Sequence, residues 1–138
     1  MTLNWATQVS REPVRLGIAV QKEAYTHELL MESENYSLNL LHRDDRGLVR
    51  KFVKPVAVDR ETMTLNGIGF REGLLSTPIL TSALAYLECR IEDRVDTGDH
   101  TFFVGDVVNA AFQNEAENAG SERPPVLRME DTRMNYGG

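Results

Sequence analysis

Two long segments joined by a short polar turn, within residues 82–112, constrain the fold more than any other part of this chain. In the first segment two sets of side chains alternate residue by residue. The mainly apolar set is Ala83, Ala85, Leu87, Cys89 and Ile91. The intervening set is Leu84, Tyr86, Glu88, Arg90 and Glu92. Because successive side chains of a strand point to opposite faces, this period of two predicts a half-buried strand with one apolar face.

The second segment, residues 100–112, is rich in Phe and Val and contains no proline, so its backbone can pair along its whole length. Between the segments lie the turn-forming residues Asp96, Thr97, Gly98 and Asp99. Gly98 can adopt a positive φ without a steric cost. The sequence therefore predicts an antiparallel hairpin.

Shorter periodic segments precede this hairpin. The pattern predicts strands at residues 1–10, 16–20 and 36–40, and helices at residues 26–34 and 44–53. Residues 57–80 contain several glycines, and we expect them to be mostly loop with short extended pieces, of which residues 63–68 are the best candidate. This order of elements favours a mainly β fold, a small antiparallel barrel with flanking helices.

The last part of the chain differs in composition. Residues 114–125 are polar and contain Gly and Pro, which predicts a loop, whereas residues 126–136 again contain apolar side chains. We expect the tail to pack on the barrel or on a partner. The predicted organisation is thus one domain at residues 1–113, followed by a polar loop and tail at residues 114–138.

Composition excludes several classes of protein. The 138 residues suffice for one domain, and the net charge of −6 argues against a broad nucleic-acid surface. No apolar run approaches the roughly 20 residues of a membrane span. Cys89 is the single cysteine, and no signal-peptide pattern opens the chain, so we expect a cytoplasmic protein in which Cys89 is a buried small hydrophobe.

The sequence lacks common nucleotide-binding motifs and metal-ligand spacings. The chain has no Gly-x-Gly-x-x-Gly after a strand and no Walker-type loop, which argues against a Rossmann domain and a P-loop. His27 and His42 have no acidic or cysteine neighbours at metal-ligand spacing, so no metal site is predicted.

The hairpin residues follow a distinctive order. Leu87-Glu88-Cys89 is followed by Gly98-Asp99-His100 and then by Phe103-Val104-Gly105-Asp106-Val107. This order resembles the flavin reductase-like family of FMN-binding split barrels, and the resemblance covers nearly the whole chain. It implies a mainly β split barrel with flanking helices, forming a homodimer with FMN at the subunit interface. The implied activity is hydride transfer from NADH or NADPH to flavin, and reduced flavin would pass to a partner monooxygenase.

The resemblance also implies which residues bind the cofactor. Those assigned to the flavin ring are Thr2, Asn4, Trp5, Ala6 and Gln8. Without the family, the same segment would be an amphipathic edge strand with a buried tryptophan. Lys22, Tyr25 and Thr26 are assigned to the phosphate, because a cation, a hydroxyl group and free N–H groups at a helix start suit a phosphate dianion. The alternative is that Thr26 is only an N-cap and Lys22 a solvated side chain.

His100 is the predicted catalytic residue. The resemblance places it at the mouth of the flavin site, where an imidazole can stabilise negative charge that develops at the flavin. The alternative is a histidine that caps the hairpin turn, with Asp99 accepting hydrogen bonds from turn amides. Tyr136 resembles the aromatic tail of the family, which approaches the flavin, although it can also be a frayed end.

The start of the chain departs from the family pattern, because the family domain normally begins one strand earlier. We therefore expect a barrel that lacks this first strand or is completed in another way, for example by a dimer partner. This departure keeps two alternatives to the reductase open. One is a non-catalytic FMN-binding or structural split barrel, and the other is a barrel that binds a different small molecule. The sequence does not rank NADH against NADPH.

Overall fold

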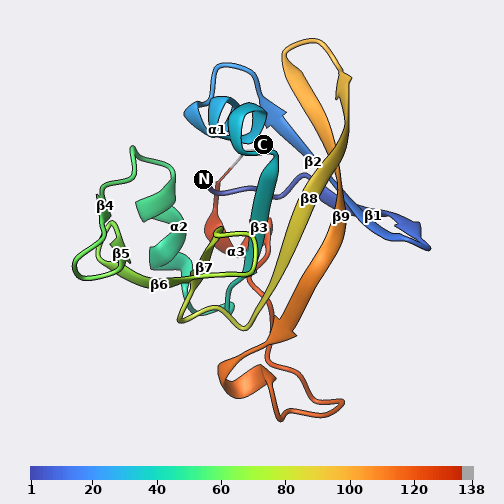
Figure 1. The fold of residues 1–138 in the computed structure, drawn as a ribbon. Helices are drawn as coiled ribbons and strands as arrows, with labels where there is room; N and C mark the ends of the chain where they lie inside the picture. Colours follow the sequence, from blue (N-terminus) through green and yellow to red (C-terminus); the bar gives the residue numbers. More distant parts are fainter. Residues whose placement is uncertain (135–138) are drawn as a thin grey trace.

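The computed structural model describes residues 1–134, whose strands form two antiparallel sheets (Figure 1). The five-stranded sheet contains, in spatial order, β1 (Ala6–Arg11), β2 (Val14–Gln21), β9 (His100–Phe112), β8 (Ala85–Asp96) and β3 (Asn35–Leu40). The four-stranded sheet contains β4 (Val58–Asp59), β5 (Thr64–Leu65), β6 (Ile68–Glu72) and β7 (Pro78–Leu80). The helical elements are α1 (Tyr25–Ser33), α2 (Arg46–Phe52), the 3₁₀ helix η1 (Asn114–Ala116) and α3 (Met129–Thr132).

The β8–β9 hairpin lies at the centre of the larger sheet, as the sequence predicted (Figure 1). Its turn contains Gly98 with φ of 108°, a value that favours glycine. The pairing is not continuous, because the register shifts between Glu88 and Cys89 and again between Ile91 and Asp93. Such β-bulges bend and twist a strand, which lets a long hairpin curve around a core.

Residues 57–80 form more structure than the sequence indicated, because the short extended pieces expected in a loop are four strands, β4 to β7, that pair in one small sheet. Side chains join this sheet to β3. The hydroxyl of Ser37 donates to the carbonyl of Pro78 at 2.6 Å, and the side-chain oxygen of Asn39 accepts from the N–H of Leu80 at 2.8 Å. The two sheets therefore meet at β3 and β7 through amide and hydroxyl groups.

The main core lies beneath α1. Its buried residues are Ile18, Val20, Leu30, Tyr36, Cys89, Ile91 and Phe103. Cys89 is fully buried, as predicted, and burial raises the pKa of its thiol to about 11, so the thiolate is disfavoured. The hydroxyl of Tyr36 donates to the carbonyl of Leu16 at 3.0 Å, which satisfies the one polar group of an otherwise apolar side chain.

β8 was predicted to be a half-buried strand, but in its first half both faces are buried. Tyr86 and Glu88 are both buried, and the Glu88 side chain has no exposed surface. The carboxylate accepts hydrogen bonds from the backbone N–H groups of Leu74 and Leu75, both at 2.9 Å. The hydroxyl of Thr77 and the amide of Asn109 complete the set, at 2.8 and 2.7 Å.

Three of these donors, from Leu74, Leu75 and Thr77, tie the loop between β6 and β7 to the central hairpin. Gly73 in this loop lies so close that a Cβ atom there would come within 2.2 Å of the Glu88 carboxylate. Burial by itself would raise the pKa of Glu88, but the hydrogen bonds, led by that of Leu75, outweigh it and hold the pKa below its usual value. Glu88 is therefore an ionised group whose charge is neutralised by oriented donors.

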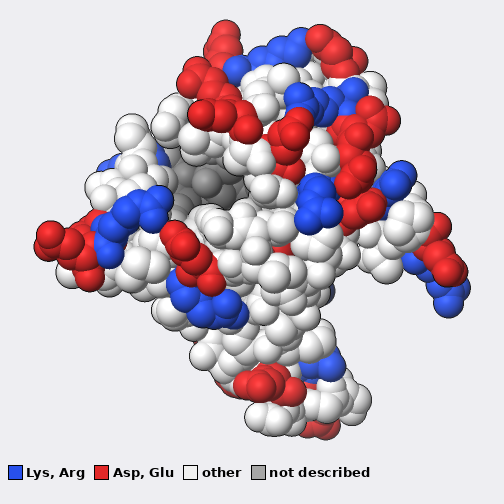
Figure 2. Space-filling view, viewed as in Figure 1, with Lys and Arg blue, Asp and Glu red and all other residues white. Residues whose placement is uncertain are grey.

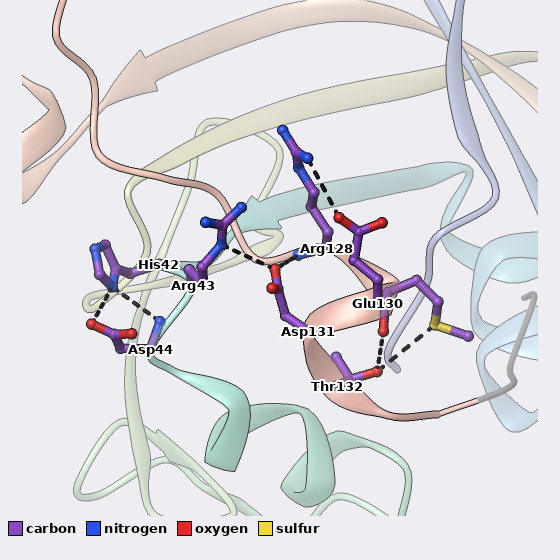
Figure 3. Close-up of polar contacts among 8 residues, drawn as sticks. His42, Arg43, Asp44, Arg128, Glu130, Asp131 and Thr132 are labelled. Carbon is purple, nitrogen blue, oxygen red and sulfur yellow. Dashed lines mark hydrogen bonds and ion pairs between the residues drawn. The ribbon is translucent and has the colours of Figure 1, made fainter.

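The tail pairs with the segment that follows β3. The N–H of Arg43 donates to Pro125, and the N–H of Leu127 donates to Leu41, at 2.9 and 2.8 Å. The guanidinium of Arg43 also binds Asp131 of α3 at 3.2 Å (Figure 3). Within residues 1–134 there is no helix with both the length and the apolar character needed to cross a membrane.

We predict that Glu88→Gln lowers the free energy of unfolding by about 3 kcal/mol, because the amide group would face N–H donors that now bind a carboxylate. The folded-state pKa of Glu88 is lowered, so its stabilising effect is present above the unfolded pKa of about 4.3 and is lost as pH falls through the folded value. Urea unfolding at pH 7 and at successively lower pH measures this. The matched control is Glu92→Gln, on the exposed part of the same strand. An equal effect of the two variants at pH 7 would contradict the prediction.

Candidate functional site

Trp5 and His100 form an aromatic pair beside the turn of the central hairpin. Their ring centroids are 5.1 Å apart and their planes are inclined by 45°. The carbonyl of Trp5 accepts a hydrogen bond from the N–H of Ala19 at 3.0 Å, which fixes the backbone before β1 begins. Trp5 is 50% exposed, so the edge strand with a buried tryptophan is not what forms. An exposed indole beside an imidazole is a surface that can stack on a flat ring.

His100 is held by its neighbour in the chain. Its Nδ1 lies 2.8 Å from a carboxylate oxygen of Asp99, and its side chain is only 14% exposed. The hydrogen bond to His100, together with the charge of a protonated ring, lowers the pKa of Asp99. Asp99 therefore orients the imidazole. The turn amide of Gly98 donates to Asp96 at 2.9 Å, so Asp96 and not Asp99 accepts from this amide.

Lys22 joins the end of β2 to the same turn. Its ammonium group lies 2.7 Å from the carboxylate of Asp96, and its N–H donates to the carbonyl of Asp99 at 2.9 Å. The hydrogen bond from Lys22 is the main reason that the pKa of Asp96 lies below its usual value. Lys22 is therefore a surface side chain whose charge is already paired with a carboxylate.

The start of α1 differs in one respect from the expectation. Ala24, not Thr26, is the N-cap residue, and it supplies no side-chain hydrogen bond. Thr26 lies in the first turn, where Tyr25 is 71% exposed. His27 fixes this end of the helix to β9, because its Nε2 lies 2.8 Å from the hydroxyl of Thr101. The N–H groups at this end have no side-chain cap, which leaves donors at the surface.

The remaining predicted residues are not all near this cluster. The hydroxyl of Thr2 donates to the carbonyl of Val49 in α2 at 3.1 Å, and the amide of Gln8 donates to the carbonyl of Ser10 at 3.0 Å. Asn4 and Ala6 are exposed on either side of Trp5. The structure thus brings Trp5, His100 and Lys22 together at the hairpin turn, whereas Thr2 contacts α2 and Gln8 contacts its own strand. Tyr136 lies outside the described residues.

Charge is distributed unevenly around this site. Asp and Glu side chains gather over α1 and the outer end of the β8–β9 hairpin, at the top of Figure 2. Those close in sequence to the site are Glu23, Glu28, Asp93, Asp96 and Asp99. Among residues 1–134, no group of three or more His, Cys, Asp or Glu side chains has the arrangement of a metal site. The site is therefore an aromatic and acidic surface with a neutralised lysine.

Comparison with known proteins shows the family. The flavin reductase like domain matches residues 1–136 of the chain. The chain is 36% identical over 115 residues to the putative diflavin flavoprotein A 1 of Nostoc sp. strain PCC 7120, a match to 79% of this chain and 20% of that protein. This chain thus spans about a fifth of the length of that relative.

Solved structures agree with this result. The NADH:FAD oxidoreductase of Streptomyces globisporus C-1027 is 30% identical with a TM-score of 0.73, over 82% of this chain and 67% of that one. The flavin reductase component of a bacterial two-component tryptophan halogenase is 26% identical, also with a TM-score of 0.73, over 93% of this chain and 82% of that one. The fold is accordingly the split barrel of flavin reductases, and this chain belongs to the flavin reductase-like family.

Proposed function

We propose that this chain binds flavin at the hairpin turn and catalyses its reduction by NADH or NADPH. The observation that carries the proposal is the pairing of exposed Trp5 with His100, whose ring is oriented by Asp99, in a chain of the flavin reductase-like family. A flavin bound there would supply the hydride acceptor, and the protein would supply orientation and electrostatics. We propose FMN as the flavin.

The residues on the ring side are compatible with a flavin. The half-exposed indole of Trp5 offers a flat apolar face, and the exposed amide of Asn4 offers a donor and an acceptor for the polar edge of the ring. Ala6 is small and exposed, which leaves room for close approach. Thr2 and Gln8 donate hydrogen bonds to protein carbonyl groups. Each side chain would have to break that hydrogen bond before it could bind the flavin ring.

The residues assigned to the phosphate are less favourable for binding a flavin than those assigned to the ring. Thr26 and the uncapped N–H groups at the start of α1 suit a phosphate, and α1 is nine residues long. The ammonium group of Lys22, however, is already paired with Asp96. A phosphate bound here would have to displace that carboxylate. This cost favours a second candidate function, a flavin-binding protein without catalysis.

His100 is the group that we propose to act on the reacting ring. Asp99 accepts from Nδ1 when that atom carries a proton, which leaves Nε2 as the ring nitrogen directed away from Asp99. From this position His100 would stabilise the negative charge that a flavin ring gains with a hydride. Trp5 would hold His100 in place from one side.

We further propose a homodimer with flavin at the subunit interface and, in the cell, a monooxygenase that uses the reduced flavin. The exposed edge strand β1 supports the dimer, because edge strands with apolar side chains are normally covered. Val9 and Val14 are 44% and 46% exposed in and beside this strand. A cytoplasmic location remains a prediction from the sequence.

The first prediction concerns activity itself. The purified chain should retain added FMN through desalting, and anaerobic NADH or NADPH should bleach its absorbance near the flavin maximum. Retained flavin that does not bleach would support the non-catalytic alternative. A protein that stays colourless after FMN has been added and removed by desalting would contradict both the reductase and the non-catalytic flavin-binding protein.

A second prediction concerns His100. His100→Ala should slow flavin reduction about tenfold or more while changing flavin affinity less, because the imidazole is needed mainly when charge develops. Stopped-flow reduction and a flavin titration measure the two effects. Asp99→Asn is the matched variant, since it keeps the ring and removes only the charge of its partner. Equal reduction rates for His100→Ala and the unchanged protein would leave His100 as a turn residue.

The phosphate assignment is tested by Lys22→Ala with Thr26→Ala. This double variant should weaken FMN binding about tenfold and leave riboflavin binding unchanged, because riboflavin has no phosphate. The control is Asp96→Asn, which frees Lys22 from its counter-charge and should strengthen FMN binding. Unchanged FMN affinity in both variants would refute the assignment.

A further inference from the structure

A second candidate binding site lies between α2 and α3, away from the hairpin turn. It is a pocket of about 380 Å³, lined by Arg46, Gly47, Arg50, Asp131, Thr132, Arg133 and Met134. The three arginines give it an excess of positive charge, in a protein whose net charge is −6. No residue of this pocket was predicted to bind a ligand from the sequence.

The arginines of this pocket lack counter-charges. Arg46 and Arg50 are separated by four residues and therefore project from the same side of α2. Within residues 1–134, the guanidinium groups of Arg46, Arg50 and Arg133 have neither a hydrogen-bond acceptor nor a carboxylate partner. By contrast, Lys22 forms an ion pair with Asp96, and Arg43 forms one with Asp131.

The one carboxylate among the residues that line the pocket already has two hydrogen-bond donors. Asp131 accepts hydrogen bonds from the guanidinium of Arg43 at 3.2 Å and from the N–H of Arg128 at 3.0 Å (Figure 3). The N–H of Arg128, with the charge of Arg43, holds the pKa of Asp131 below its usual value. Because Arg43 balances the charge of Asp131, the charge of the three other arginines is not cancelled.

The floor of the pocket leaves space for a ligand. A Cβ atom added at Gly47 would meet no atom within 4 Å. Planar guanidinium groups bind phosphate oxygens in pairs, which makes arginine the preferred residue for phosphate recognition. The volume is in the range of small-molecule sites and exceeds what a simple inorganic ion needs.

The pocket is linked to the hairpin site through the N-terminal segment. Thr2 binds α2 through the carbonyl of Val49, and Trp5 follows three residues later in the chain. Three residues span about 10 Å at most. This segment therefore connects Trp5 to α2, the helix that carries Arg46 and Arg50.

We propose that the α2–α3 pocket binds the phosphate groups of a nucleotide used in the reaction, through Arg46, Arg50 and Arg133. The identity of the nucleotide rests on the proposed function. The nicotinamide dinucleotide is the source that agrees with a flavin phosphate at Lys22 and Thr26, whereas a flavin phosphate in the α2–α3 pocket would replace that assignment. The existence of the site is independent of that function, because an inorganic polyanion tests it directly.

The first test uses inorganic pyrophosphate and the full chain without flavin. Arg46→Gln with Arg50→Gln should weaken pyrophosphate binding about tenfold or more in a calorimetric titration. The control is Arg60→Gln with Arg71→Gln, in the turn after β4 and on β6, which changes the net charge equally. Pyrophosphate binding that is absent, or that weakens equally in both double variants, would overturn the site.

The second test separates the two sources of phosphate. If the pocket binds the flavin phosphate, the Arg46 and Arg50 variant should lose affinity for FMN and keep its affinity for riboflavin. If it binds the dinucleotide, KM for NADH should rise with kcat unchanged, and ADP-ribose should compete with NADH less well than in the unchanged protein. A variant that loses pyrophosphate binding but keeps both nucleotide affinities would overturn the nucleotide assignment. A chain that reduces no flavin would refute the proposed function, while the pyrophosphate and FMN titrations would still decide the pocket.

Discussion

Backbone pairing between β8 and β9 is the interaction on which the rest of this structure depends. The hairpin supplies two neighbouring strands of the larger sheet, β2 and β3 pair with its outer edges, and its turn brings Asp96, Asp99 and His100 together. At its other end, Glu88 holds the loop between the small strands β6 and β7. One local element therefore positions the candidate site and joins it to the second sheet.

Much of this arrangement could be predicted from the sequence, because the hairpin is a local structure with a strong pattern. The period of two in residues 83–92 and the turn at Gly98 depend only on neighbouring residues. The burial of Glu88 could not be predicted this way. A carboxylate in an alternating strand normally faces solvent, and the donors that allow its burial come from residues up to 21 positions away.

Contacts between residues far apart in the sequence also limited the prediction of the candidate site. The family pattern placed His100, and the structure brings it against Trp5, a residue 95 positions earlier (100 − 5). The pairing of Lys22 with Asp96 was not predicted, since opposite charges 74 residues apart carry no local signal. The α2–α3 pocket was missed for a related reason. Arg46 and Arg50 look like ordinary exposed helix residues until α3, from the other end of the chain, packs beside them.

The contact between Trp5 and His100 also has a practical consequence. Trp5 is the single tryptophan of the chain, so the intrinsic fluorescence of the protein in the tryptophan band comes from one position. That position lies 5.1 Å from the imidazole that we assign to catalysis and is open to solvent on its other side. The protein therefore contains its own optical reporter, which responds to events beside His100 without any added label.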